Sequence, residues 1–449
     1  MLLIVDILSG QSIITGQFTR PFGESSVAAQ GETILTGLLD VDDTLRRILA
    51  GIIPLPAEDV PLAEALDRVL AEDVVAELAL PPFANSSMDG FAVRAADVAG
   101  ASQENPVQLT VSMDISAGAA PEGHLHPGEA ARIMTGAPLP PGADAVVPVE
   151  ATDVRWDAGH EDQPPARVGI LRAVNPGDYV RPVGEDIQVG QLVIRAGDIL
   201  RPQEIGVLAS LGRVTVPVIR RPRVAILSSG DELVEIDEPL TPGKIRNSNS
   251  YVLAGLVTIN GGVPIRIPTA RDTLDDVRRC FREALAHHPD MIVSSAGVSV
   301  GAHDVVRTVL DELGEVKLWR LNLRPGKPLA YGRLQGIPFF GLPGNPVSAQ
   351  VTFDVVVRRA LLKMGGRPDI VPMAEAVLAE DIPADGRLTY FRVKLERGPD
   401  GQLIAHTTGT QSSGAMLSMV LADGLLIVPA GRREARTGER FPVRLLREL

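Results

Sequence analysis

The stretch that decides the fold is D-M-I-V-S-S-A-G-V-S-V-G-A-H-D, residues 290–304. A short apolar run, Met291–Val293, leads into a series of small residues. The next residues, V-V-R-T-V-L-D-E-L, have the apolar spacing of a helix. The pattern therefore predicts a strand, a small-residue loop and a helix. In a parallel sheet, such a loop lies at the carboxyl end of a strand, where ligands bind.

The composition of this loop favours an anionic ligand. Backbone N–H groups of small residues and the N-terminus of the following helix attract negative charge. Ser294, Ser295, Gly297 and Ser299 line the loop, and Asp304 supplies a carboxylate that orients a substrate group or a metal. The alternative is a tight turn whose glycines serve close packing alone.

The overall composition restricts the class of protein. The chain has 449 residues, enough for two to four domains, and 45% of them are hydrophobic. A net charge of −13 argues against a general nucleic-acid or acidic-membrane binder. The single cysteine, Cys280, excludes internal disulfides. No apolar run reaches about 20 residues and no signal peptide is recognisable, so we expect a cytoplasmic protein without a membrane partner.

The chain divides by pattern into four parts. Residues 1–39 read as an extension of unknown role. Residues 40–222 contain three expected helices, over 41–52, 61–70 and 202–212, and an inserted β-subdomain at about 76–178. Residues 223–371 alternate strands with helices, which predicts a doubly wound, mostly parallel α/β sheet with helices on both faces. Residues 372–449 return to strands and predict a β-barrel or sandwich.

Four strand-end loops of the α/β part should share one edge of the sheet. They are residues 228–232, 294–304, 324–328 and 341–348. Their acids, Asp231, Glu232 and Asp304, are suited to Mg²⁺. Arg324 and Lys327 lie in a segment with five basic residues and no acid, Val316–Arg333, and can neutralise an anion. The residues alone thus predict a Mg²⁺-using site for a phosphorylated ligand and a second oxyanion; a solvated basic face is the alternative.

Six motifs, taken in order along the chain, are similar to those of one family. They are S-S-M-D-G-F-A (86–92), M-T-G-A-P (134–138), S-S-G-D-E-L (228–233), S-S-A-G-V-S-V-G-A-H-D (294–304), R-P-G-K-P (324–328) and G-L-P-G-N-P-V-S (341–348). Residues of about 40–449 resemble the MoeA family of molybdopterin molybdenumtransferases, which includes the C-terminal region of gephyrin. One such motif would be weak evidence for the resemblance, but six motifs in the same order are specific evidence for it.

The resemblance implies a reaction and an architecture. Adenylated molybdopterin and molybdate would react with Mg²⁺ to give molybdenum cofactor and AMP. The site would lie at the interface of a homodimer, with transient contacts to a molybdopterin adenylyltransferase and to molybdoenzymes. The fold would combine an elongated helical and β N-terminal region and its β-subdomain with the molybdopterin-binding α/β domain and a C-terminal barrel.

The resemblance also assigns roles to residues, position by position. Those matching active-site acids are Asp231, Glu232 and Asp304. Those matching the pterin and phosphate cradle are Ser294, Ser295, Gly297, Ser299, Gly344 and Asn345. Those matching the molybdate pocket are Arg324, Lys327, Pro328, Ser348, Arg392 and Ser413. Those matching polar groups that the partner subunit presents are Asp89, Thr135 and Asp186.

The chain departs from the family pattern at three motif positions. Arg324 stands where Lys is commoner, Ala296 replaces a usual Gly, and Phe91 replaces a common Tyr. Two other functions stay open: a molybdopterin adenylyltransferase, which shares the α/β domain, and a non-enzymatic scaffold of the gephyrin type. The sequence does not distinguish molybdate from tungstate, since both are tetrahedral dianions of similar size.

Overall fold

The computed structural model describes residues 37–155, 163–295 and 305–448. The chain forms two compact units, each described here by itself. The first comprises residues 1–58, 67–69 and 219–449, and the second comprises residues 59–66 and 70–218. Within the described ranges, no helix has the length and apolarity needed to cross a membrane.

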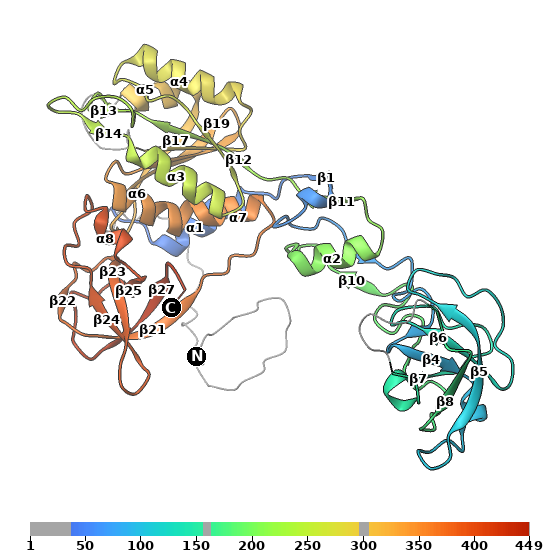
Figure 1. The fold of residues 1–449 in the computed structure, drawn as a ribbon. Helices are drawn as coiled ribbons and strands as arrows, with labels where there is room; N and C mark the ends of the chain where they lie inside the picture. Colours follow the sequence, from blue (N-terminus) through green and yellow to red (C-terminus); the bar gives the residue numbers. More distant parts are fainter. Residues whose placement is uncertain (1–36, 156–162, 296–304, 449) are drawn as a thin grey trace, which may run out of the picture. The chain divides into compact units, whose positions relative to one another are not determined.

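The first unit contains a six-stranded sheet in the order β15-β12-β16-β20-β19-β17 (Figure 1). Its strands are β12 (Arg223–Ser228), β15 (Val263–Arg266), β16 (Met291–Ser295), β17 (Gly314–Arg320), β19 (Pro328–Leu334) and β20 (Ile337–Leu342). β15, β12, β16 and β20 are parallel neighbours, so their carboxyl ends lie at one edge. β19 and β17 extend the sheet in antiparallel fashion.

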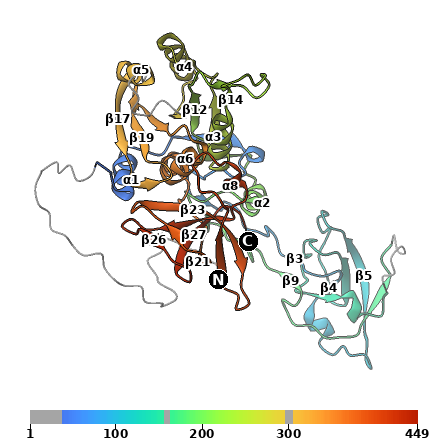
Figure 2. The ribbon, with the colours of Figure 1, turned by 90° about the vertical axis from the view of Figure 1, so that its left-hand side faces the viewer.

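Helices cover both faces of this sheet. They are α1 (Val41–Ala50), α3 (Ser248–Ile259), α4 (Leu274–Ala286), α5 (Val305–Leu313), α6 (Pro346–Thr352) and α7 (Arg358–Met364), with the π-helical segment η4 (Phe353–Val357) between the last two. α4 and α5 pack with Ile292, whereas α1, α3, α6 and α7 pack with Val293. Successive strand residues point to opposite faces, and Figure 2 shows α4 and α5 apart from α1, α3 and α6. The predicted doubly wound α/β architecture is confirmed.

Side-chain caps begin three of these helices. Asp40, Asn247 and Thr273 are the N-caps of α1, α3 and α4, and each side chain accepts a hydrogen bond from a backbone N–H of the first turn. These bonds satisfy donors that a helix leaves without an internal partner. The short polar residues that precede the helical repeat of apolar residues therefore determine where each helix begins.

The segment after Lys327 differs from the prediction. The sequence predicts one strand before residues 324–328 and one at 338–342, but the chain also forms β19 between them and returns as β20. Gln335 and Gly336 connect them with φ of +49° and +85°, as a type I′ hairpin turn requires. β19 contains a glycine and an arginine, so its strand character depends on pairing with β17 and β20 rather than on an apolar run.

The C-terminal strands close into a barrel. They are β21 (Met373–Leu378), β23 (Leu388–Arg397), β24 (Leu403–Thr407), β25 (Gly424–Val428) and β27 (Arg440–Leu445). β23 pairs with both β24 and β25, which completes a ring of five strands. The short elements around it are β18 (Leu323–Arg324), β22 (Ile382–Pro383), β26 (Glu434–Ala435) and α8 (Leu417–Val420). Because β18 pairs with β23, the barrel is tied to the segment that carries Arg324.

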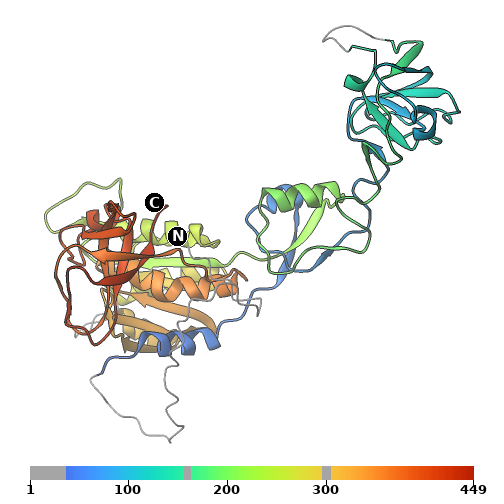
Figure 3. The ribbon, with the colours of Figure 1, turned by 90° about the horizontal axis from the view of Figure 1, so that it is seen from below.

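The second unit is mostly β-structure. Its strands and helix are β2 (Val74–Val75), β3 (Asn85–Ser86), β4 (Gly90–Val93), β5 (Val107–Ile115), β6 (Glu129–Ile133), β7 (Ala145–Pro148), β8 (Arg167–Ile170), β9 (Val180–Arg181), β10 (Leu192–Ile194) and α2 (Pro202–Ser210). A five-stranded sheet has the order β7-β4-β6-β5-β8. α2 packs in an apolar cluster with β2 and β10 (Figure 3). Three strand pairs lie outside this sheet: β2 with β10, β3 with β9, and β1 (Ala57–Pro61) with β11 (Thr215–Ile219).

The prediction of a second helix near the N-terminus, over 61–70, is wrong. Leu62–Glu64 form a single 3-10 turn, and Asp67 has φ of +59°, which a right-handed helix excludes. Leu70 forms an isolated bridge to Val218 instead. The helical spacing of apolar residues arises because some of them enter a core built mainly from distant strands, which the local pattern does not reveal.

Candidate functional site

A cavity of about 1000 Å³ in the first unit is lined by both the α/β sheet and the barrel. Each of the four strand-end loops singled out in the sequence supplies lining residues: Glu232, Ser295, Arg324–Pro328, and Pro343–Pro346 with Ser348. The barrel supplies Arg387, Thr389–Arg392 and Gln411–Gly414, and the segment at β14 (Ile245–Arg246) supplies Ile245–Asn249. Loops distant in sequence thus meet around one space.

The ends of β12 and β16 carry paired serines. Ser228 and Ser295 are opposite each other in the parallel register, and their hydroxyl oxygens are 2.8 Å apart. Ser295 lines the cavity. Ser294 instead lies with Cys280 and Phe281 of α4, and its buried Oγ has no hydrogen-bond partner among the described residues. The alternation of a strand therefore places the two predicted serines on different faces.

The turn between β20 and α6 connects the sheet to the barrel. Asn345 Nδ2 donates to Ser413 Oγ over 2.9 Å. On the other side, Asn249 Nδ2 donates to the Gly344 carbonyl oxygen over 2.8 Å. Ser348, in the first turn of α6, is buried and lines the cavity. These bonds fix the barrel loop at Ser413 against the strand-end loop.

The segment from Arg324 to Pro328 passes along the cavity between β18 and β19. Gly326 has φ of +117°, and a side chain there would collide with Thr352 Oγ1, so glycine is required. Lys327 is exposed, and no ion pair among the described residues includes it. The segment therefore brings two basic side chains, Arg324 and Lys327, to the lining.

Arg392, on β23, is fully buried, with 1% of its surface exposed. Its Nε donates to Ser418 Oγ over 3.1 Å, and its Nη2 donates to the Ser412 carbonyl oxygen over 3.0 Å. No carboxylate among the described residues forms an ion pair with it. Burial, and then the charge of Arg324, lower the pKa of Arg392 from 12.5 to about 10. At neutral pH the guanidinium is charged, and such a buried charge is costly unless an anion pairs with it.

Arg324 and Arg387 share one carboxylate, that of Asp385. Arg387 Nη2 and Nε lie 2.5 and 3.1 Å from Asp385 Oδ2, and Arg324 Nη1 lies 3.5 Å from the same oxygen. The hydrogen bond from Arg387, with a smaller effect of the charge of Arg324, holds the pKa of Asp385 below its usual value. Both arginines line the cavity, whereas Asp385 does not.

The charge of the described lining is strongly positive in a protein that is acidic overall. Its basic residues are Arg246, Arg324, Lys327, Arg387 and Arg392. Glu232 is the one acid among the described lining residues, and none of the described hydrogen bonds uses its carboxylate. The described lining therefore has the charge that suits an anionic ligand, with Glu232 as its one carboxylate.

The predicted acids do not all line this cavity. Asp231 lies in a neighbouring hollow, where its Oδ1 accepts a hydrogen bond from the backbone N–H of Asp272 over 3.2 Å. Asp304 lies outside the described residues, as do Gly297 and Ser299. Across the described ranges, no group of three or more His, Cys, Asp or Glu side chains is arranged to hold a metal ion.

Three family models match nearly the whole chain. The MoeA N-terminal region (domain I and II) matches residues 39–212, a probable molybdopterin binding domain matches 225–363, and the MoeA C-terminal region (domain IV) matches 375–446. Molybdopterin molybdenumtransferase 2 of Mycobacterium tuberculosis is 39% identical over 86% of this chain and 94% of its own length. The chain belongs to the MoeA family.

Other relatives agree with this membership. Molybdopterin molybdenumtransferase of Bacillus subtilis is 35% identical over 91% of this chain and 94% of its own. A solved structure of a molybdopterin biosynthesis MoeA protein from Pyrococcus horikoshii has a TM-score of 0.77 and 32% identity, covering 92% of this chain and 100% of that one. This MoeA-family chain is an enzyme of the transferase class, in molybdenum cofactor biosynthesis.

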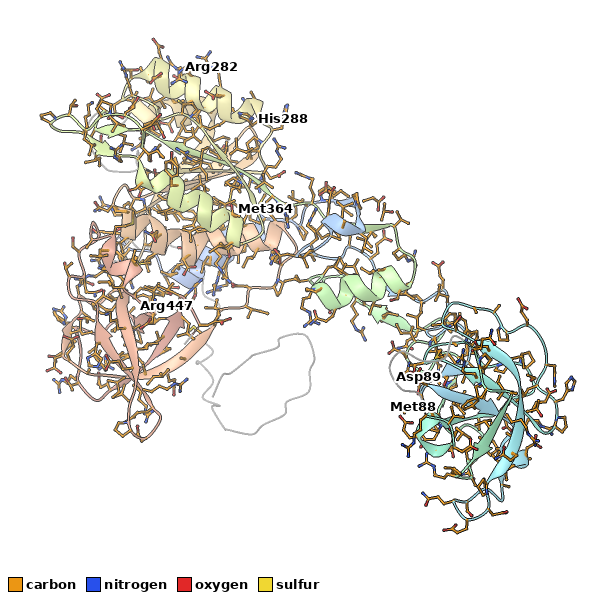
Figure 4. All side chains as sticks on the ribbon, viewed as in Figure 1. Met88, Asp89, Arg282, His288, Met364 and Arg447 are labelled. Carbon is orange, nitrogen blue, oxygen red and sulfur yellow. The ribbon has the colours of Figure 1, made fainter. Side chains whose placement is uncertain are left out.

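Three residues assigned by resemblance to the partner's side of the site lie in the second unit. Both the backbone N–H and the Oγ1 of Thr135 donate to Asp89 Oδ1, over 2.7 and 2.8 Å. Asp89, labelled in Figure 4, is exposed, as is Asp186. Phe91, where a tyrosine is common in the MoeA family, is fully buried on β4. Apolar burial explains the tolerance of a phenylalanine there.

Sequence reasoning missed several lining residues of this MoeA-family site. Arg246 comes from the short strand β14, Arg387 from the bend just before β23, and Gln411 and Ser412 from a barrel loop. Arg387 follows Asp385-Gly386 in a sequence that reads as an ordinary turn before a strand. No local signal distinguishes it. What places it at the cavity is the pairing of β18 with β23.

Proposed function

We propose that this chain transfers molybdenum from molybdate to adenylated molybdopterin, forming molybdenum cofactor and releasing AMP in a Mg²⁺-dependent reaction. The observation that carries the proposal is Arg392, a buried guanidinium that forms no ion pair with a carboxylate of the described residues. It lines a cavity to which the strand-end loops also contribute. The names of the relatives, molybdopterin molybdenumtransferase, support the same reaction.

Molybdate would bind at the basic end of the cavity. Arg324, Lys327 and Arg392 supply donors and charge, and a charge-assisted hydrogen bond contributes about 1.5–3 kcal/mol. Ser348 and Ser413 line the same cavity and add hydroxyl donors. Holding the oxyanion beside the dithiolene sulfurs makes their encounter effectively intramolecular. Positive charge that is already in place also stabilises negative charge that develops during transfer.

The pterin and its phosphates would face the strand-end loops. Ser295, Gly344 and Asn345 lie at the carboxyl ends of β16 and β20, where α/β sheets bind ligands. Asn345 is fixed by its bond to Ser413 and therefore keeps one orientation. Gly297 and Ser299 belong to the same proposed cradle by resemblance.

The carboxylates at the strand ends supply part of the ligand set that a magnesium ion requires. Mg²⁺ usually takes one or two protein carboxylates, with the remaining positions filled by water and substrate phosphates. Glu232 is exposed at the cavity, and its carboxylate uses none of the described hydrogen bonds; Asp231 is its neighbour, and Asp304 is the third candidate. A bound Mg²⁺ would neutralise phosphate charge as AMP leaves. Asp304→Asn is expected to lower turnover by ~10²-fold or more.

A second copy of the chain would complete the site. Asp89, Thr135 and Asp186 are the residues that would be presented by the partner subunit of a homodimer. The ordered contact of Thr135 with Asp89 supports this role, because it leaves an oriented, exposed carboxylate. Mixing inactive Asp89→Asn with inactive Lys327→Ala should restore roughly a quarter of normal activity, since half the dimers would be mixed and each would hold one intact site. Absence of restored activity, with subunit exchange verified, would contradict a shared site.

The decisive experiment is an insertion assay on the purified full chain. Adenylated molybdopterin, molybdate and Mg²⁺ are supplied, and molybdenum cofactor and AMP are measured. Product formation that requires both molybdate and Mg²⁺ supports the proposal. ATP-dependent adenylation of molybdopterin without molybdate would favour the adenylyltransferase, and inactivity in both assays would favour the scaffold.

A further inference from the structure

At the Arg392 end of the cavity, hydrogen-bond donors of the lining lie beside acceptors that already receive a hydrogen bond from the protein. Gln411 Oε1 accepts from the Arg392 backbone N–H over 3.0 Å, and the Ser412 carbonyl accepts from its Nη2. Ser413 Oγ accepts from Asn345 Nδ2. Arg392 Nη1 takes part in none of the described hydrogen bonds. Among the described residues, a ligand at this end therefore meets donors that lack an acceptor, such as Arg392 Nη1, and few acceptors that lack a donor.

The carboxylate beside Arg324, that of Asp385, is held by a second arginine, Arg387. Asp385 lies beside Arg324, but its Oδ2 accepts from Arg387 Nη2 and Nε, and its Oδ1 accepts from Arg387 Nε over 3.2 Å. Arg387 is itself anchored, since its Nη1 donates to the Leu323 carbonyl over 3.2 Å. Asp385 is absent from the described lining of the cavity. Glu232, the one lining acid, comes from the loop after β12 and not from the barrel.

We propose that this subsite selects oxyanions by protonation state, and that Arg387 enforces the selection by sequestering Asp385. A fully deprotonated tetrahedral dianion presents only acceptors and can satisfy the donors around it. An oxyanion that retains a proton, such as phosphate or arsenate, also presents an O–H that needs an acceptor. That unsatisfied donor weakens binding. The inference deepens the proposed function by naming the substrate class and two specificity residues, and it rests on that function for its physiological ligand.

Sulfate and phosphate are a matched pair of probes for this selection. At mildly alkaline pH both are tetrahedral dianions of similar size, but phosphate alone carries a proton. Binding is measured by isothermal titration calorimetry on the full chain without pterin, using molybdate, sulfate and phosphate. Molybdate and sulfate should bind, and phosphate should bind about 5- to 150-fold more weakly than sulfate. Equal binding of sulfate and phosphate, or no binding of any oxyanion, would overturn the proposal.

The role of Arg387 is tested by releasing Asp385. In Arg387→Gln, Asp385 loses the hydrogen bonds from the Arg387 side chain, while its 3.5 Å contact with Arg324 remains. Its carboxylate then has capacity to accept the phosphate O–H, so the sulfate-to-phosphate ratio should fall to within about twofold of unity. The double variant Arg387→Gln/Asp385→Asn removes the carboxylate and should restore a wild-type ratio. An unchanged ratio in the single variant, with the fold verified by circular dichroism, would overturn the assignment to Arg387.

These measurements separate the inference from the proposed function. The wild-type comparison needs no variant, so it stands even if Arg387→Gln does not fold. It also uses binding rather than turnover. If the chain discriminates sulfate from phosphate but inserts no molybdenum, the selective subsite stands and the proposed function fails. If the chain inserts molybdenum but binds phosphate as well as sulfate, the proposed function stands and the selective subsite fails.

Discussion

The two walls of the cavity differ in how they present charge. The strand-end wall consists of small residues and turns, with exposed groups such as Glu232, Asn345 and Lys327. The barrel wall holds Arg392 under full burial, with Nε and Nη2 fixed by Ser418 and the 410–412 loop. An exposed charge is stabilised by water, whereas a buried one depends on a partner. The comparison indicates that the barrel wall has the greater need for a bound anion.

The largest effect should come from the barrel wall, on replacing Arg392 with alanine. The change removes a preorganised buried charge, so molybdenum insertion should fall by ~10²–10³-fold. Turnover is measured with adenylated molybdopterin at saturating Mg²⁺. Arg397→Ala, an exposed arginine at the end of the same strand, is the control and should retain normal activity. Near-normal turnover in Arg392→Ala would contradict the inference that the barrel wall has the greater need for a bound anion.

A somewhat smaller effect is expected from the strand-end wall, for Lys327→Ala. Lys327 is exposed and forms none of the described ion pairs, so its loss should leave the fold intact while turnover falls by ~10²-fold. Lys317→Ala, at an exposed position on β17, provides the matched control. Thermal unfolding checks the fold, and the insertion assay checks the role. Unaltered kinetics in the presence of an intact fold would assign Lys327 to a solvated face.

The smallest effect concerns the bond between the walls. Asn345→Ala and Ser413→Ala each remove one side of the 2.9 Å Asn345–Ser413 hydrogen bond. Each should raise the KM for molybdate about fivefold, because a hydrogen bond contributes about 1 kcal/mol net. In a double-mutant cycle the two changes should be less than additive. Strict additivity would show that the walls act independently.

Much of the α/β part was predictable because its signals are local. The caps at Asp40, Asn247 and Thr273, the strand β16 and the helix α5 follow from short-range patterns. The predicted helix over 61–70 failed because its apolar residues enter a core formed with distant strands. β19 was missed because its strand character comes from its two neighbours in the sheet.

The candidate site likewise has features that the sequence predicts and features that it does not. The four strand-end loops are visible in the sequence because parallel strands bring their carboxyl ends to one edge. The resemblance to the family adds Arg392 and Ser413, but not the environment of Arg392 or the hydrogen bonds from Arg387 to Asp385. Those features arise when β18 pairs with β23, a contact between residues 323–324 and 388–389.

The sequence by itself determined the alternation of strands and helices, the loops at the strand ends and the excess of basic residues near Lys327, because each is set by neighbouring residues. The tertiary structure alone decided that a barrel lines the same cavity as the described parts of those loops and buries a guanidinium that has no carboxylate partner among the described residues. The physical reason is that burial and unpaired charge depend on which distant segments pack together, and no local pattern records that choice.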